Sequence, residues 1–187
     1  MKFIELESER LIYRKFKEDD FPIVFDWTTN AENLKYWEEG PLKESQVDGY
    51  INWLIFNTKD EEGFHYEYAV VRKSDNKLIG SATLMHLPDK PELGWTLHRD
   101  YWRQGYGTEM GKTMLQLGFD ILNFRRIIAV CNALNVGSYK IMEHIGMRRE
   151  GHFIKSRRGN SALNHEWCDE FIYAILQEEW IAAKDIG

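Results

Sequence analysis

The spacing of hydrophobic residues along the chain changes several times, and each change predicts a new element of secondary structure. Residues 10–16 alternate between two faces, with Leu11 and Tyr13 on one of them, as in a β-strand. The acidic pair Asp19–Asp20, followed by Pro22, predicts the start of a helix. A second helix is predicted by apolar residues at the spacing of one helical face: Val47, Tyr50, Ile51, Leu54 and Ile55.

The period then shortens to that of β-structure. Residues 64–71 and 77–84 are rich in β-forming residues and are joined by the polar turn 74–76, which predicts a hairpin. Residues 92–98 predict a third strand. The spacing returns to the helical period over residues 108–122.

The last third of the chain returns to strands. Residues 126–131 form a nearly continuous apolar run, which is typical of a strand buried on both faces. Asn135 is predicted to begin a short helix that ends at Gly146. Two further strands, 147–155 and 166–176, are predicted on either side of a basic loop, Ser156-Arg157-Arg158-Gly159-Asn160.

These elements predict an α/β (α+β) fold in the order β-α-α-β-β-β-α-β-α-β-β, with a central sheet covered on both faces. The length of 187 residues corresponds to one domain, residues 1–187. Hydrophobic residues make up 43% of the chain, which is enough for a substantial core. The seven Trp and nine Tyr also predict an aromatic pocket and leave room for a homodimer interface.

Net charge and cysteine content indicate which kinds of partner and which cellular compartment to expect. The net charge of −6 argues against non-specific binding to nucleic acid and suits a cationic or amine substrate. Cys131 and Cys168 lack a CxxC partner and are expected to be reduced thiols. The acidic residues near the N-terminus exclude a signal peptide, and no apolar run is long enough to span a membrane. We therefore expect a cytoplasmic protein.

A glycine turn, residues 102–107 (Trp-Arg-Gln-Gly-Tyr-Gly), lies between the predicted strand 92–98 and the predicted helix 108–122. Glycine lets the backbone approach a ligand closely, and the free amides of a helix N-terminus favour an anion such as pyrophosphate. A dinucleotide site is disfavoured because Gly111 comes one residue late for G-x-G-x-x-G and because the next strand ends in Cys131-Asn132 without an acidic residue. A P-loop is excluded because no Gly-Lys-Ser/Thr follows.

The glycine turn resembles the Gln/Arg-x-x-Gly-x-Gly/Ala acetyl-CoA motif of the GNAT superfamily of N-acetyltransferases. The order of elements is also similar over nearly the whole chain. Further segments resemble the ribosomal-protein N-terminal acetyltransferases of the RimJ/RimL type: Arg10-Leu11-Ile12-Tyr13-Arg14, Gly105-Tyr106-Gly107-Thr108-Glu109, Asn135-Val136-Gly137-Ser138, Gly146-Met147-Arg148-Arg149-Glu150-Gly151 and Glu178-Glu179-Trp180.

The resemblance implies a mixed, mostly antiparallel sheet and a set of residues that bind acetyl-CoA. The pantetheine arm would pair with the strand Leu93-Gly94-Trp95-Thr96-Leu97 like an added strand. The remaining cofactor contacts implied by the resemblance are Arg103, Gln104, Gly105, Tyr106, Gly107, Thr108, Asn132, Asn135 and Ser138. Trp102 departs from the pattern, because the family has Gln or Arg at this position.

Amide formation requires a free amine, so a base must remove a proton from the ammonium form. Glu92, at the beginning of the strand expected to bind the cofactor, is the candidate base. Many GNAT enzymes carry a tyrosine acid where this chain has Met142, so Ser138 or Tyr139 becomes the candidate donor. Asp169 and Glu170 are expected either to bind the substrate amine or to be a solvated strand end.

The remaining polar residues suggest less. The six histidines, His65, His86, His98, His144, His152 and His165, share no ligand spacing, so no metal is expected. Arg148-Arg149 and Arg157-Arg158 are expected to be solvated, with contact to an acidic partner as the alternative for Arg157 and Arg158. The predicted activity is direct acetyl transfer to a primary amine, foremost a protein N-terminal α-amine. The alternatives are a small amine, such as a polyamine or aminoglycoside, and a non-catalytic acyl-CoA-binding module.

Overall fold

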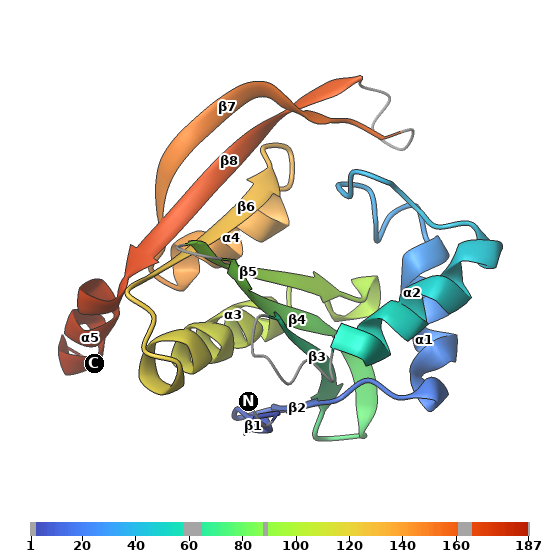
Figure 1. The fold of residues 1–187 in the computed structure, drawn as a ribbon, viewed down its shortest axis with the longest axis horizontal. Coiled ribbons are helices and arrows are strands. Elements are labelled where there is room, and N and C mark those ends of the chain that lie inside the picture. Colours follow the sequence, from blue (N-terminus) through green and yellow to red (C-terminus); the bar gives the residue numbers. More distant parts are fainter. Residues whose placement is uncertain (1–2, 58–64, 88–89, 161–165, 187) are drawn as a thin grey trace.

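The computed structural model describes residues 3–57, 65–87, 90–160 and 166–186 (Figure 1). Eight strands of this part of the chain form one sheet in the order β1-β2-β3-β4-β5-β6-β8-β7. Neighbouring strands are antiparallel except for β5 and β6, which are parallel. The strands are β1 (Leu6–Glu7), β2 (Leu11–Arg14), β3 (His65–Arg72), β4 (Lys77–Leu87), β5 (Lys90–Leu97), β6 (Arg126–Asn132), β7 (Arg148–Arg158) and β8 (Trp167–Leu176).

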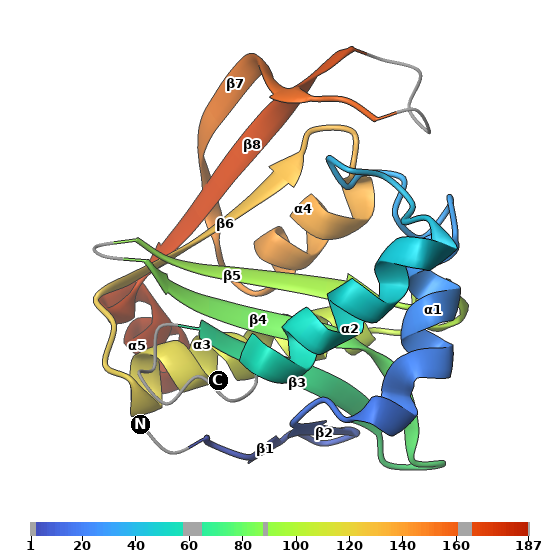
Figure 2. The same cartoon turned by 45° about the vertical axis from the view of Figure 1, so that its right-hand side comes forward.

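Helices cover both faces of this sheet, and each face has its own hydrophobic core (Figures 1 and 2). One face packs against α1 (Phe21–Thr29) and α2 (Glu44–Asn57), whose buried residues include Trp27 and Leu54. The opposite face packs against α3 (Tyr106–Gln116) and α4 (Val136–His144), whose buried residues include Met110 and Met142. The expected mixed, mostly antiparallel sheet flanked by helices is confirmed.

Two elements extend the predicted order. β1 is a two-residue strand that pairs with β2, and α5 (Gln177–Ile186) follows β8 directly. The first turn of α5 holds Glu178 and Glu179, where acidic side chains interact favourably with the helix dipole. The predicted strand 64–71 is observed as β3, and its first residue, Phe64, lies outside the described residues.

The predicted helix 108–122 is only partly right at its C-terminal end, where the chain stays helical but the turn changes from α to π. α3 ends at Gln116 and is followed by a π-helical turn, Leu117–Ile121. The amide of Leu122 donates to the carbonyl of Leu117 at 2.9 Å, five residues back. At Gly118, an added Cβ would lie 2.4 Å from Cδ1 of Ile127. The wider turn therefore coincides with close packing on β6, which sequence periodicity does not reveal.

The predicted basic loop is also partly wrong, because β7 continues to Arg158. Arg157 pairs in register with Cys168, after an irregularity in which Lys155 adopts a φ of 49°. The amide of Lys155 donates to Oδ1 of Asp169 at 2.9 Å. A bulge stabilised by a side chain of the partner strand thus lengthens a hairpin that the polar sequence suggested would open.

β5 and β6 separate soon after they meet, which divides the sheet (Figure 2). In the described residues their register holds one pair, Glu92 with Ile128. β5 is held instead by eight register pairs with β4, and β6 by seven with β8. Within the described residues, the edge of β5 beyond Glu92 therefore has no strand partner, and we call this divergence of β5 from β6 the opening.

We expect the packing of β4 on β5 to be sensitive to Gly80. A Cβ at this position would lie 2.2 Å from the carbonyl oxygen of Thr96, a backbone atom that a rotamer change cannot move. Gly80→Ala should therefore lower the free energy of unfolding by about 2–3 kcal/mol in urea denaturation. Gly49→Ala is the matched control, because its Cβ meets nothing within 4 Å on α2. It should raise stability by about 0.5–1 kcal/mol, and equal midpoints for both variants would contradict the packing.

Candidate active site

The glycine turn, residues 102–107, connects β5 to α3 at the opening between β5 and β6. Gly105 is the N-cap residue with a φ of 82°, a left-handed conformation that disfavours any side chain. The first bond of the helix runs from the Glu109 amide to the Gly105 carbonyl at 3.1 Å. The amides of Tyr106, Gly107 and Thr108 precede this bond, so they are the donors that a helix N-terminus leaves for an anion.

Gly107 sets how closely α4 approaches α3. A Cβ at Gly107 would lie 2.4 Å from Cδ1 of Ile141 on α4. Asn135 caps α4, as expected, because its Oδ1 accepts from the Ser138 amide at 3.1 Å. Asn132 closes the preceding turn by accepting from the Leu134 amide at 2.9 Å. The two asparagines therefore hold the start of α4 next to the end of β6.

The backbone of β5 presents hydrogen-bonding groups toward the opening. The His98 amide donates to Ile79 of β4 at 2.8 Å, so the alternation of a strand turns the polar groups of Trp95 and Leu97 away from β4. The side chains of Leu93, Trp95 and Leu97 contribute to the core beside α3, whereas Thr96 is buried on the opposite face. The strand thus combines a packed side-chain face with a backbone edge that faces the opening.

Trp102 has a role at this edge that the sequence did not reveal. Its indole Nε1 donates to the Leu97 carbonyl at 2.7 Å, and Nδ2 of Asn33 donates to the same oxygen at 3.3 Å. The Leu97 carbonyl is therefore already occupied, which leaves the Leu97 amide and both polar groups of Trp95 directed toward the opening. The neighbouring Arg103 and Gln104 are exposed, and Gln104 donates to the Asp100 carbonyl at 2.8 Å.

Glu92 lies half-buried at the position where β5 and β6 meet. Glu170 of β8 lies nearby and forms an ion pair with Arg157 of β7 at 3.0 Å. Burial raises the pKa of Glu92, the charge of Glu170 raises it further, and Arg157 opposes the shift. The arrangement gives a carboxylate whose proton affinity is greater than usual, as a general base requires.

Ser138 and Tyr139 point to different surroundings. The Ser138 hydroxyl interacts with the thiol of Cys131, whose pKa burial raises to about 11. Tyr139 packs its ring against Phe171 at 5.8 Å between centroids, in an edge-to-face contact. Met142, at the position of the family tyrosine, is buried in the core and has no proton to donate.

The acidic and basic residues of the last hairpin are mostly paired with one another. Asp169 accepts from His152 at 2.7 Å and from the Lys155 amide, so its carboxylate supports the bulge. Arg149 stacks on Phe171 at 3.7 Å. Arg148 and Arg149 are exposed, as expected, although Arg148 also bonds to Glu150 and Glu179. Arg157 is instead half-buried, in its ion pair with Glu170.

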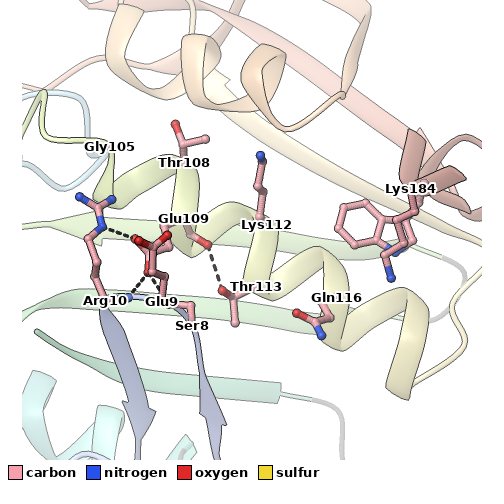
Figure 3. A pocket seen from close by; sticks show the side chains of 11 residues that line it. Ser8, Glu9, Arg10, Gly105, Thr108, Glu109, Lys112, Thr113, Gln116 and Lys184 are labelled. Carbon is pink, nitrogen blue, oxygen red and sulfur yellow. Dashed lines mark hydrogen bonds and ion pairs between the residues drawn. The ribbon is translucent and has the colours of Figure 1, made fainter. Parts of the chain in front are cut away.

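A groove of about 570 Å³ runs along the side of α3 from the glycine turn toward α5 (Figure 3). Arg10 lies at its end nearest the turn, and its guanidinium contacts Glu109 of α3. In the sequence, Arg10 and Glu109 belong to two separate segments. The structure brings them together across 99 residues, a contact that no local pattern could predict.

No group of three or more His, Cys, Asp or Glu side chains within the described ranges is arranged to hold a metal ion. His65 and His98 instead interact with Glu67 and Asp26, at 3.2 and 2.7 Å. His165 lies outside the described residues. Among the helices that the structure describes, none has the length and hydropathy needed to span a membrane.

The raised pKa of Glu92 predicts a cost in stability. A folded-state pKa above the unfolded value means that ionising Glu92 is harder in the folded protein. Stability is therefore lost as pH rises through that interval, and the loss is complete above the folded pKa. Glu92→Gln should raise Tm at pH 7–8 and leave it nearly unchanged near pH 4, as followed by thermal denaturation. Glu178→Gln, on the exposed face of α5, should show no such pH-dependent gain. A Tm gain in Glu92→Gln that did not vary with pH would show that the raised pKa of Glu92 is not its cause.

Known proteins share both this sequence pattern and this fold. The "Acetyltransferase (GNAT) domain" family matches residues 10–148. The uncharacterised N-acetyltransferase YnaD of Bacillus subtilis is 33% identical over 180 residues, covering 95% of this chain and 99% of that protein.

Two solved structures extend the likeness to three dimensions. A GNAT-family acetyltransferase from Bacillus anthracis superposes with a TM-score of 0.80 at 33% identity, over 94% of this chain and 99% of that one. Spermidine N-acetyltransferase from Vibrio cholerae, in complex with CoA and spermine, superposes with a TM-score of 0.78 at 19% identity, over 93% and 99%. Because the family matches most of the chain and the solved structures share its fold, the chain belongs to the GNAT acetyltransferases.

Proposed function

We propose that this protein transfers an acetyl group from acetyl-CoA directly to a primary amine, and that the acceptor is a protein N-terminal α-amine. The observation that carries the proposal is the convergence of three features at one opening. These are the backbone edge of β5, the free amides that begin α3, and the carboxylate of Glu92. We treat residues 1–187 as one acetyltransferase domain, because both cores share the same sheet.

The residues around the opening fit acetyl-CoA. The amides of Tyr106, Gly107 and Thr108 suit the diphosphate, because they are the donors at the start of α3. The polar groups of Trp95 suit the amides of the pantetheine arm, which would lie beside β5 like an added strand. Asn132, Asn135 and Ser138 would line the other side of the arm, at the end of β6 and the start of α4.

The chemistry assigns the proton to Glu92. In the reaction the amine nitrogen forms a bond to the thioester carbonyl carbon, and the carbon–sulfur bond breaks to release the thiol of CoA. Glu92 takes the proton of the acceptor ammonium, directly or through water, and so supplies the nucleophilic free amine. As the amide forms, the nitrogen loses a second proton and the sulfur gains one. Ser138 or Tyr139 is the proposed donor to the sulfur, and its hydroxyl is reprotonated by the proton that the nitrogen releases.

Proton affinity favours an α-amine as acceptor. An N-terminal α-amine has a pKa of about 7.7–8.0, against about 10.4 for a lysine-type amine. A single carboxylate with a raised pKa removes a proton more readily from the α-ammonium group, which is the stronger acid of the two. The segments that resemble RimJ/RimL enzymes, including Arg10–Arg14 and Gly146–Gly151, support the same acceptor.

A small cationic amine is the second candidate, favoured by an observation on the face of the sheet that carries Glu92. Glu67 of β3 lies on the same face of the sheet, where it accepts from Thr83 at 2.7 Å. Next to it runs an aromatic series in which Trp37 contacts Tyr50 and Tyr50 stacks on Trp53. Carboxylates and aromatic faces both attract cations, and the structural relative from Vibrio cholerae was solved with a polyamine.

Thiol release from acetyl-CoA tests the activity and separates the two acceptors. The purified protein is supplied with peptides that have free or blocked N-termini, and in parallel with spermidine and aminoglycosides. We expect turnover with free N-termini and none with blocked ones. Turnover with spermidine alone would replace the proposed acceptor by the second candidate. Tight CoA binding with no turnover on any amine would instead identify a non-catalytic acyl-CoA-binding module.

Replacing the base should change kcat and its pH dependence. Because Glu92 acts as a base when ionised, the wild-type rate should fall as pH drops through its raised pKa. Glu92→Gln should lower kcat by about 10²–10⁴-fold at neutral pH and remove this acidic limb from the profile. Activity should recover partly at alkaline pH, where more of the amine is already free. A variant with wild-type kcat and an unchanged profile would exclude Glu92 as the base.

A further inference from the structure

Arg10 approaches the glycine turn from outside the opening, at the start of β2. Its Nε donates to Oε2 of Glu109 at 2.7 Å, and its own amide donates to Oε1 of the same carboxylate at 2.7 Å. Its Nη1 donates to the Gln104 carbonyl at 3.0 Å. Its guanidinium also lies over the ring of Tyr106, 4.3 Å from the centroid. One side chain thus contacts the residues before and after Gly105 and the first full turn of α3.

The contact with Gln104 determines which way the next amide points. In a trans peptide the carbonyl of one residue and the N–H of the next point in opposite directions. Since Arg10 holds the Gln104 carbonyl on its own side, the N–H of Gly105 points away from Arg10. The left-handed φ of Gly105 makes this peptide a point where the backbone could otherwise rotate.

Glu109 keeps the guanidinium of Arg10 in place. Burial alone would raise the pKa of Glu109, but the hydrogen bonds from Ser8 and Arg10 outweigh it and hold that pKa below its usual value. The Ser8 hydroxyl donates to Oε1 at 2.6 Å. The carboxylate therefore stays ionised and binds Arg10 through a charged pair, so Arg10 contributes mainly orientation rather than a free positive charge.

We propose that Arg10 is a positioning residue for the diphosphate of acetyl-CoA. It fixes the Gln104–Gly105 peptide and the Tyr106 ring, so that the amide of Gly105 and the amides that begin α3 face the ligand. The inference rests on the proposed function, because it assumes that the turn binds CoA. Arg10 itself lies behind the turn and does not touch the ligand. An arginine is required because its planar fork reaches Glu109 and Gln104 together, which a lysine cannot do.

Arg14, the last residue of β2, provides a matched control. It forms a two-pronged ion pair with Asp20, at 2.7 Å for each bond, and also donates to the Lys15 carbonyl. Arg10→Met and Arg14→Met therefore both remove an arginine–carboxylate pair that links β2 to its surroundings. Arg14 contacts the segment before α1 rather than the glycine turn, so its loss should affect stability alone.

Two probes test the proposal. By calorimetry, Arg10→Met should bind CoA on the order of tenfold or more weakly than wild type, whereas Arg14→Met should bind it with wild-type affinity. In kinetics, Arg10→Met should raise KM for acetyl-CoA with little change in kcat. Its kcat/KM for acetyl-pantetheine, which lacks the diphosphate, should stay at the wild-type value. Arg10→Lys, which keeps the charge and one donor, should recover only part of the CoA affinity.

The outcomes of these experiments separate this inference from the proposed function. A wild-type protein that does not bind CoA would overturn the proposed function and this inference together. Wild-type binding that Arg10→Met leaves intact would overturn the inference alone. Equal losses with CoA and acetyl-pantetheine would also overturn it, because they would indicate a general structural role. If Arg10→Met does not fold, Arg10→Lys decides, and wild-type CoA affinity in that variant would exclude the need for the fork.

Discussion

The parallel contact of β5 with β6 is the constraint on which the site depends. Each of these strands is bound along its length to an antiparallel partner, β4 or β8, while they share one register pair with each other. Two parallel strands require a crossover, and α3 supplies it. That helix begins at Tyr106, after the glycine turn that follows β5. The opening between the strands therefore has an unpaired backbone edge on one side and free helix amides at its mouth.

Hydrogen bonds from outside the opening hold its parts in shape. Trp102 and Asn33 occupy the Leu97 carbonyl, and Arg10 occupies the Gln104 carbonyl. Both sets satisfy acceptors near the turn and leave donors directed inward, which suits an anionic, strand-like ligand. Trp102, where the family has Gln or Arg, thus has a structural role, because its indole bonds the glycine turn to the end of β5.

Glu92 shows how a reactive group and a stable fold oppose each other. The partial burial and the neighbouring Glu170 that raise its proton affinity also make its ionised form costly to the fold. Arg157 offsets part of this cost by pairing with Glu170. The long β7–β8 hairpin is therefore more than an exposed ribbon, because it brings the compensating charge beside the candidate base.

The sequence by itself determined the order of most elements, the glycine turn, the cap at Asn135 and the family, because these depend on local periodicity, backbone freedom and short motifs. It missed the π-helical turn after Gln116 and the continuation of β7 through Arg157, where close packing of Gly118 and a bond from Asp169 override local preference. Tertiary structure alone decided the pairing of Arg10 with Glu109, the indole bond of Trp102 and the proximity of Glu92 to Glu170. The first and last of these contacts join residues far apart in the chain, and the bond of Trp102 to Leu97 depends on the path of the turn after β5. Their existence depends on how strands diverge and register, which no single segment encodes.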